Sequence, residues 1–205
     1  MTTTAAPIRY TPADVERLSD RDGKLYELVH GELVEKHAPV TEHILVEKHV
    51  STRSNAVAVK VAVALCGRYP DTEARLFIEQ PTYCFPSGRM RRPDVALVWS
   101  RRLPAELTHD ELEIPPDFVA EVVSPNNTFF DQLDRVEDYL RAGVSIVWVI
   151  DPTHRTVHVY RKDGTYDLLR SGDVLSDEPL LPGLSLPIAD IFPAVAPSGI
   201  SGSGS

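Results

Sequence analysis

The sequence predicts a mixed α/β fold in which helices pack on a central β-sheet. Two observations support this prediction. Patterns typical of helices alternate along the chain with patterns typical of strands, and the 205 residues, 42% of them hydrophobic, supply enough apolar material for one core. We expect residues 11–193 to form this single domain. Residues 1–10 are mostly polar or small, and residues 194–205 end in the linker-like sequence SGISGSGS, so we expect both ends to be flexible.

Three stretches have the features of helices. The first begins after Thr11, which serves as an N-cap with Asp14 completing a capping box, and we expect this helix to end near Leu18. The Ala- and Val-rich residues 51–69 have helical length, although their alternating valines are also compatible with a strand. The third stretch, TFFDQLDRVEDYLRAG, has apolar residues at helical spacing and Gly143 as its stop signal.

The remaining segments favour strands. The sequence YELVHGELVEK alternates around His30 and Gly31, which predicts a β-hairpin. The continuous apolar run SIVWVIDP is typical of a strand that is buried on both faces. We predict further strands in RLFIEQPTYCF, DVALVW, DFVAEVV, TVHVYRKDG and TYDLLRSG. The order of these elements predicts a sheet flanked by helices, with the hairpin as an N-terminal extension.

The net charge and the cysteines narrow the functional class. The formal charge of -9 opposes non-specific binding to nucleic acid or to anionic membranes, so any phosphate-binding site must be local. No apolar run approaches the roughly 20 residues of a membrane span, and the N-terminus lacks the features of a signal peptide. The two cysteines, Cys66 and Cys84, show no metal-ligand spacing. We therefore expect a cytoplasmic protein that does not bind membranes.

Two carboxylates stand in segments that otherwise have the pattern of buried strands. Asp94 opens DVALVW and Glu121 lies within DFVAEVV, and a buried carboxylate is costly unless a cation pairs with it. A divalent cation such as Mg²⁺, which takes oxygen ligands, would allow the two carboxylates to lie together on neighbouring strands. Two unrelated ion pairs, for instance to Arg91 or Arg92, would explain the same residues.

Five sequence motifs follow one another along the chain between about Asp20 and Phe192. They are YELVHGELVEK, RRPDVALVW, DFVAEVVSPNNT, DQLDRVEDYLRAGVSIVWVIDPTHRTVHVY and LPGLSLPIADIF. Together they resemble the Uma-two family of restriction-endonuclease-like proteins, within the PD-(D/E)XK nuclease superfamily. The resemblance implies a restriction-endonuclease-like fold, a mixed β-sheet flanked by helices. It also implies hydrolysis of nucleic-acid phosphodiester bonds, with a metal ion at one end of the sheet.

Carried over position by position, the resemblance implies roles for individual residues. Asp94 matches the superfamily's aspartate after proline, and Glu121 matches the acidic residue of the second motif. Val122 provides a main-chain carbonyl of the kind that completes the metal shell. The implied cofactor is Mg²⁺ or Mn²⁺. The implied partner is nucleic acid, and we expect DNA rather than RNA. Because double-strand cleavage is easiest for a two-fold dimer, we also expect a homodimer.

One position departs from the superfamily's pattern. The usual lysine would stand two residues after Glu121, where this chain has Val123, and the Uma-two family supplies it instead from the next helix, four residues before a tyrosine. Here Arg135 stands four residues before Tyr139. Arginine keeps the positive charge but essentially never gives up its proton, so activity is weak or absent if the lysine must deprotonate water. A helix-surface ion pair of Arg135 with Asp131, itself a recurrent family position, is the alternative.

Further charged residues complete the candidate site. Five arginines flank Asp94 in the sequence and suit contacts with a phosphate backbone: Arg89, Arg91, Arg92, Arg101 and Arg102. A solvated loop without a ligand is the alternative for them. Glu27, in the N-terminal hairpin, either stands near the metal, as N-terminal acids do in the superfamily, or faces solvent, and of the two we favour solvent.

Two hypotheses about function follow. The first is a Mg²⁺-dependent endonuclease in which Asp94 and Glu121 bind the ion and Arg135 faces the scissile phosphate. The second is a protein of the same fold that has lost catalysis and serves as a nucleic-acid-binding or protein-interaction module. Arg135 in place of lysine favours the binding module, and the net charge of -9 favours the interaction module.

Overall fold

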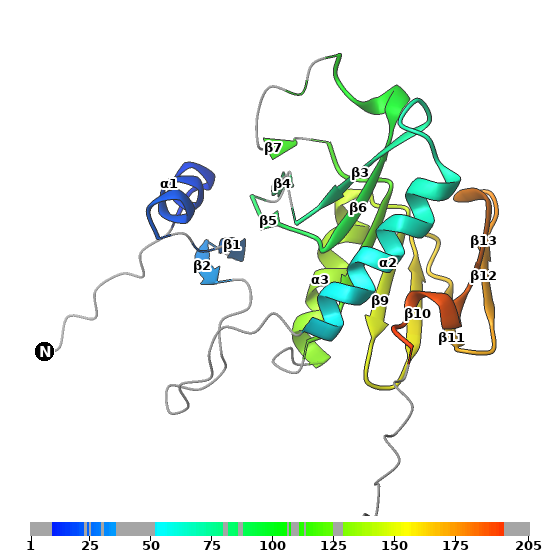
Figure 1. The fold of residues 1–205 in the computed structure, drawn as a ribbon. Coiled ribbons are helices and arrows are strands. Elements are labelled where there is room, and N and C mark those ends of the chain that lie inside the picture. Colours follow the sequence, from blue (N-terminus) through cyan, green and yellow to red (C-terminus); the bar gives the residue numbers. More distant parts are fainter. Residues whose placement is uncertain are drawn as a thin grey trace, which may run out of the picture.

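A six-stranded β-sheet lies between helices α2 (Thr52–Arg68) and α3 (Phe129–Ala142), as Figure 1 shows. The predicted mixed sheet flanked by helices is therefore confirmed. We predict flexibility for residues 1–10 and 194–205, and all of these except residues 10 and 194 lie outside the described residues. The computed structural model describes residues 10–22, 24, 26–29, 31–35, 52–79, 82–85, 88–105, 107, 111–112, 114–124 and 129–194.

The central sheet has the strand order β11-β10-β9-β8-β6-β3. Strands β8 and β9 pair in parallel, whereas every other neighbouring pair in this sheet is antiparallel. Helix α3 connects the two parallel strands, because a parallel pair needs a crossover connection. The six strands are β3 (Ala74–Ile78), β6 (Val95–Trp99), β8 (Phe118–Val122), β9 (Ile146–Asp151), β10 (Thr156–Arg161) and β11 (Tyr166–Arg170).

Alternation along the strands divides the core into two layers. Val122 of β8 packs in a cluster with α2, whereas Val119 of β8 and Ala96 of β6 pack in a cluster with α3. Successive side chains of a strand point to opposite faces. Asp94, two residues before Ala96, and Glu121, two residues after Val119, therefore fall on the α3 face. The fold places both predicted carboxylates on the same side of the sheet.

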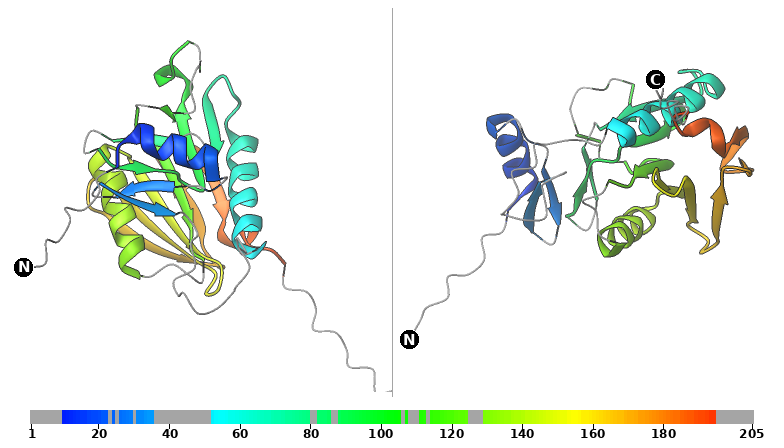
Figure 2. Two further views of the ribbon diagram at one scale, coloured as in Figure 1. Left: turned by 90° about the vertical axis from the view of Figure 1, so that its left-hand side faces the viewer. Right: turned by 60° about the horizontal axis from the view of Figure 1, so that its bottom comes forward.

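A second sheet, which the sequence analysis did not predict, has the order β2-β1-β5-β4-β7. The predicted hairpin forms its first two strands, and Gly31 in the turn has a φ of 82°. Strands β5 and β7 have two residues each, too few to show an alternating pattern. Figure 2 shows the hairpin and α1 as a lobe beside the central sheet. The strands are β1 (Tyr26–Val29), β2 (Glu32–Glu35), β4 (Thr82–Cys84), β5 (Met90–Arg91) and β7 (Glu111–Leu112).

Helix α1 (Pro12–Asp22) begins as predicted but is longer. The main-chain N–H of Thr11 donates to the carboxylate of Asp14 at 3.0 Å, and the main-chain N–H of Asp14 donates to the hydroxyl of Thr11 at 3.3 Å. The predicted capping box is therefore present. The helix continues past Leu18 because the first helix-breaking residue in the sequence after it is Gly23.

The C-terminal elements cover the α2 face of the core. Strands β12 (Val174–Asp177) and β13 (Leu181–Pro187) form a two-stranded sheet, and the 3₁₀ helix η2 (Ile188–Ile191) follows it. Apolar residues of all three pack in the same cluster as α2. A second 3₁₀ helix, η1 (Ser100–Arg102), follows β6. In the described part of the chain, no helix combines the length and the hydropathy needed to span a membrane.

The glycine that ends α3 provides a test of this fold. Gly143 has a φ of 105°, a backbone conformation in which an L-residue is strained, and a Cβ there would lie 3.8 Å from Cγ of Pro115. We predict that Gly143→Ala lowers the free energy of unfolding by about 1–2 kcal/mol. Gly67→Ala is the matched control, because Gly67 lies within α2 and nothing lies within 4 Å of an added Cβ.

The control variant should raise the free energy of unfolding by up to about 1 kcal/mol, since alanine favours a helix over glycine. Urea denaturation measures both variants. Equal changes of the same sign would show that the backbone conformation at the end of α3 carries no strain penalty.

Candidate active site

Asp94 lies where the start of β6 meets the end of the antiparallel strand β8. Its Oδ2 accepts a hydrogen bond of 2.7 Å from the main-chain N–H of Val122. The N–H and C=O of one strand residue face the same neighbouring strand, so the carbonyl oxygen of Val122 also faces the β6 side. Asp94 is buried, with 7% of its surface exposed. The structure thus brings Asp94 and the main chain of Val122 together at one end of the sheet.

Glu121, the residue before Val122, receives its partners from helix α3. Its Oε1 accepts a hydrogen bond of 2.6 Å from the hydroxyl of Tyr139 and lies 3.4 Å from Nη1 of Arg135. Burial raises the pKa of Tyr139, and the charge of Glu121 raises it further, so the phenol remains a neutral donor. The buried carboxylate of Glu121 thus accepts a hydrogen bond from a neutral phenol and lies beside a cation.

Glu27 of β1 has no exposed surface. Two nitrogens of Arg135 meet its two carboxylate oxygens at 2.8 Å each, a bidentate pairing. Nη1 of Arg91 and the main-chain N–H of Arg92 also donate to it, at 3.0 and 3.2 Å. The prediction that Glu27 faces solvent is wrong. Its partners come from the β5 segment and α3, which the local pattern of the hairpin cannot reveal.

Asp138 of α3 is a buried acid that the sequence analysis did not select. It accepts hydrogen bonds from Nε and Nη2 of Arg91, at 3.0 and 2.5 Å, and it pairs with Nη1 of Arg89. Arg91 thus bridges Glu27 and Asp138. The available sequence signal was helical spacing, because Asp138 follows Arg135 by three residues and so lies on the same side of the helix.

Arg135 is buried and bridges Glu27 and Glu121, so it is not the solvent-exposed cation of the helix-surface alternative. Burial alone would lower its pKa, but the charges of Glu27 and Glu121 outweigh burial and raise that pKa well above its usual value. Arg135 is therefore a permanent cation between two carboxylates. Asp131 is exposed in the first turn of the same helix.

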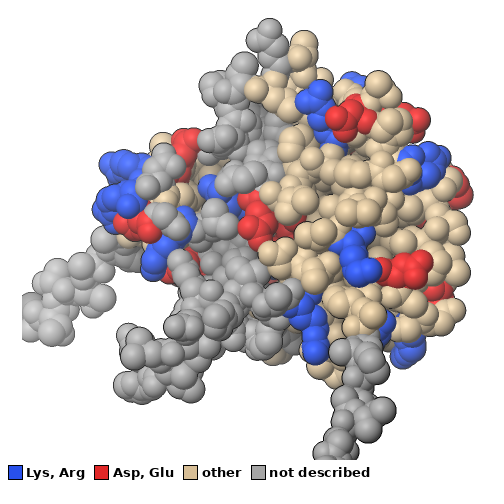
Figure 3. Space-filling view, in the orientation of Figure 1, with Lys and Arg blue, Asp and Glu red and all other residues tan. Residues whose placement is uncertain are grey.

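The predicted phosphate-binding surface comprised Arg89, Arg91, Arg92, Arg101 and Arg102. Arg91 and Arg92 are buried near Asp94, whereas Arg101 and Arg102 follow the far end of β6, roughly 17 Å away at the rise of an extended strand. All five flank Asp94 in the sequence, but the structure does not bring all five to it, because β6 separates its two ends. On the face shown in Figure 3, the described basic and acidic side chains are interspersed.

The donors at this end of the sheet fit a hard divalent cation. The carboxylates of Asp94 and Glu121 and the carbonyl of Val122 are oxygen donors on adjacent strands, and Mg²⁺ is commonly held by one or two carboxylates together with waters. Within the described residues, no group of three or more His, Cys, Asp or Glu side chains is placed to hold a metal ion. A metal here would therefore depend on two carboxylates and the main chain.

The fold and the site together define a class of protein. An aspartate lies at the start of one strand, a glutamate at the end of its neighbour and an arginine on the following helix, which is the order that the resemblance to restriction-endonuclease-like proteins implies. The chain belongs to the Uma2 family, described as "Putative restriction endonuclease", whose family model matches residues 12–189. The predicted family is thereby confirmed.

Solved structures that resemble this chain include that of "a putative nuclease belonging to DUF820 from Anabaena variabilis ATCC 29413". The TM-score is 0.69 at 22% sequence identity, and the match covers 83% of this chain and 90% of that chain. At this identity the likeness shows the fold alone, and it agrees with the predicted nuclease-like fold. Among curated proteins, none matches the sequence.

The hydrogen bond from Tyr139 to Glu121 can be tested with a pair of tyrosine variants. Tyr139→Phe deprives a buried carboxylate of one donor, so we predict that the free energy of unfolding falls by about 1–3 kcal/mol. Tyr83→Phe is the matched control, because Tyr83 is also fully buried and its hydroxyl has no hydrogen-bond partner among the described residues.

Removing the Tyr83 hydroxyl should leave stability unchanged or slightly higher. Urea denaturation compares the two variants directly. Equal losses would show that the Tyr139 hydroxyl contributes no more than an unpaired one.

Proposed function

We propose that this protein is a divalent-metal-dependent endonuclease that hydrolyses phosphodiester bonds of nucleic acid, with DNA as the first expected substrate. The observation that carries the proposal is the hydrogen bond from the N–H of Val122 to Asp94, which brings that carboxylate to the residue next to the buried Glu121. Membership of a family described as "Putative restriction endonuclease" supports it.

Asp94, Glu121 and the carbonyl oxygen of Val122 would hold the ion, Mg²⁺ or Mn²⁺. When bound, such an ion polarises a phosphoryl oxygen and lowers the pKa of a coordinated water. The protein's own contribution is to hold both carboxylates in fixed positions. Asp94 is fixed by a main-chain donor from the neighbouring strand, and Glu121 is fixed by the hydroxyl of Tyr139.

Arg135 would stabilise negative charge rather than transfer a proton. Its pKa lies well above the usual value because two carboxylates face it, so it does not act as a base. Its fork already meets Glu27 with both terminal nitrogens and approaches Glu121 with one of them. A phosphate that approaches Glu121 would therefore meet a cation whose position Glu27 controls.

A second candidate function is a nucleic-acid-binding or protein-interaction module that keeps the fold without cleavage. The specific observation that favours it is the bidentate pairing of Arg135 with Glu27. Arg135 stands at the position where the family has lysine, and this pairing already engages its guanidinium. The net charge of -9 favours a protein partner over nucleic acid. A homodimer and a cytoplasmic location remain part of the proposal, and light scattering in solution tests the dimer.

The metal site can be tested with isosteric amides. Asp94→Asn and Glu121→Gln keep an oxygen acceptor for Val122 and Tyr139 but remove the negative charge that a cation requires. We predict that each abolishes the heat of Mg²⁺ or Mn²⁺ binding in calorimetry. Plasmid nicking should fall roughly a hundredfold or more, a loss typical of removing a group that stabilises transition-state charge.

Glu137→Gln is the matched control for these amides. Glu137 lies on α3 with its side chain 55% exposed and pairs with the exposed Arg141, so the same chemical change should leave metal binding and nicking as they are. Metal binding that persists in both Asp94→Asn and Glu121→Gln would refute the assigned ligands.

The variant Arg135→Lys tests whether an arginine or a lysine at this position of α3 supports faster cleavage. Lysine restores the compact donor that the family has at this position, so we predict faster nicking than in the natural chain. Arg135→Ala is a poor test, because it leaves Glu27 without its bidentate partner and a broken buried pair costs about 3–5 kcal/mol. Nicking rates of Arg135→Lys and of the natural chain, each normalised to folded protein, give the answer. Nicking that is unchanged or slower in the lysine variant would contradict the prediction that the compact ammonium is the better donor at this position.

A further inference from the structure

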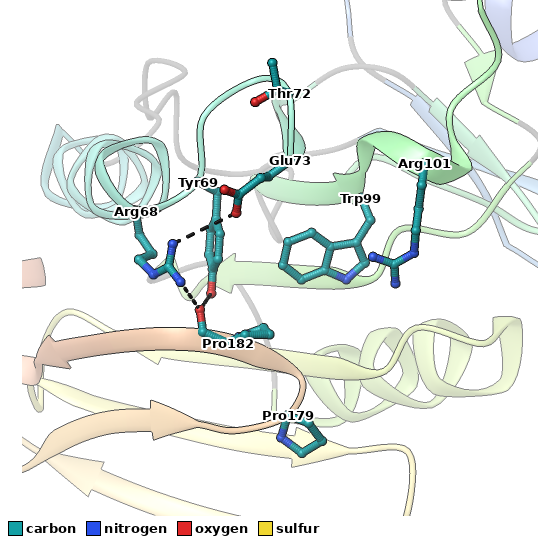
Figure 4. A pocket seen from close by; sticks show the side chains of 8 residues that line it. All are labelled: Arg68, Tyr69, Thr72, Glu73, Trp99, Arg101, Pro179 and Pro182. Atoms are coloured by element: carbon teal, nitrogen blue, oxygen red, sulfur yellow. Dashed lines mark hydrogen bonds and ion pairs between the residues drawn. The ribbon is translucent and has the colours of Figure 1, made fainter.

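A cavity of about 370 Å³ lies between the end of α2, the end of β6 and the β12–β13 turn. This volume is within the usual range of small-molecule sites. Two arginines and two aromatic residues dominate its wall, together with one acid and two prolines, as Figure 4 shows. The lining residues are Arg68, Tyr69, Thr72, Glu73, Trp99, Arg101, Pro179 and Pro182.

The cavity is separate from the candidate active site. Trp99 ends β6, five residues after Asp94, which corresponds to roughly 17 Å along an extended strand. Trp99 also packs against the core layer that contains α2, whereas Asp94 falls on the α3 face. A ligand in the cavity would therefore not touch the carboxylates of the proposed metal site.

Arg68 is fixed in the cavity wall by three neighbours. Its Nη2 donates to the carbonyl oxygen of Pro182 at 2.7 Å, and its guanidinium carbon lies 4.9 Å from the ring centroid of Tyr69. The third neighbour is Gly183, at which an added Cβ would collide with the same guanidinium. Glu73 faces Arg68 across 4.0 Å and offsets part of its charge.

Arg101 differs from Arg68 because it is exposed and makes no ion pair with any described residue. Its guanidinium carbon lies 5.7 Å from the ring centroid of Trp99. The indole of Trp99 lies between Tyr69 and Arg101 in Figure 4, and its ring meets that of Tyr69 edge to face with centroids 5.2 Å apart. The cavity therefore presents a positioned aromatic surface beside an exposed arginine.

We propose that this cavity binds a nucleotide unit, with the base against Trp99 and the phosphate paired with Arg101. Base–aromatic stacking tolerates any base, and the planar guanidinium matches the oxygens of a phosphate bidentately. The lining carries one net positive charge, two arginines against Glu73, in a chain of net charge -9. This local positive charge can bind a phosphate group even though the net negative charge of the whole chain repels it.

Tryptophan fluorescence gives a direct test, because the sequence has two tryptophans and Trp148 has no exposed surface. Adenosine 5′-monophosphate should quench the emission of Trp99 in a saturable titration, and Trp99→Phe should abolish the quenching. We predict that Arg101→Ala weakens binding about tenfold, the factor expected from losing one charge-assisted hydrogen bond. Adenosine, which lacks the phosphate, should bind the natural chain as weakly as the nucleotide binds Arg101→Ala.

Arg75→Ala is the matched control, because it also removes an exposed arginine. The neighbours of Arg75 in β3, Ala74 and Leu76, face the α2 layer, so Arg75 points to the other face of the sheet, away from the cavity. This variant should bind the nucleotide as the natural chain does. A 5′-phosphorylated single-stranded oligonucleotide, titrated in parallel, distinguishes a strand end from a free nucleotide, and tight binding of either supports the proposal.

Three outcomes would overturn the proposal. The first is equal affinity of the natural chain and Arg101→Ala for the nucleotide. The second is inorganic phosphate competing as strongly as the nucleotide, which would indicate a simple anion site. The third is quenching by a proline-rich peptide without quenching by the nucleotide, which would indicate a protein partner for the aromatic and proline wall.

Discussion

The bidentate pairing of Glu27 with Arg135 is the interaction on which the rest of the candidate site depends. A carboxylate without exposed surface destabilises a fold unless cations and hydrogen-bond donors surround it. Glu27 finds its donors on α3 and on the β5 segment, so its burial fixes the N-terminal hairpin against both. The same pairing positions the guanidinium that approaches Glu121. The ion pairs of Glu27 with Arg91 and Arg135 thus connect the second sheet to α3 and position the guanidinium in the candidate site.

Local patterns were sufficient to predict the elements that carry Asp94, Glu121 and Arg135. The strands at Asp94 and Glu121 are long apolar runs, and α3 shows helical spacing with Gly143 after its last residue, so each has a clear signal. The second sheet gave no such signal, because β5 and β7 have two residues each. Strands of that length form only because a longer neighbour provides pairing partners, and this information is not local.

Charged side chains were harder to place than elements. The burial of Glu27 depends on Arg135, which is 108 residues away, so nothing within the hairpin could reveal it. Arg101 follows Asp94 by seven residues, yet the intervening strand carries it to a cavity away from the candidate site. Asp138 has the sequence pattern of an ordinary helix acid, and its burial depends on two arginine partners that lie more than 40 residues away. Pairing between distant charges is a tertiary property, and single-sequence patterns do not report it.

The crossover from β8 through α3 to β9 keeps one part of the candidate site within a short stretch of the chain. Glu121 is 14 residues from Arg135 and 18 from Tyr139, so short loops bring these three together, whereas the pairing of Glu27 closes 108 residues. The entropy lost in closing a loop grows with its length. One half of the site is therefore encoded in a compact stretch of the chain, and the hairpin contributes Glu27 across a much longer loop. Any replacement of the N-terminal lobe would therefore have to supply a buried carboxylate for Arg135, while Glu121, Arg135 and Tyr139 stay together on the crossover.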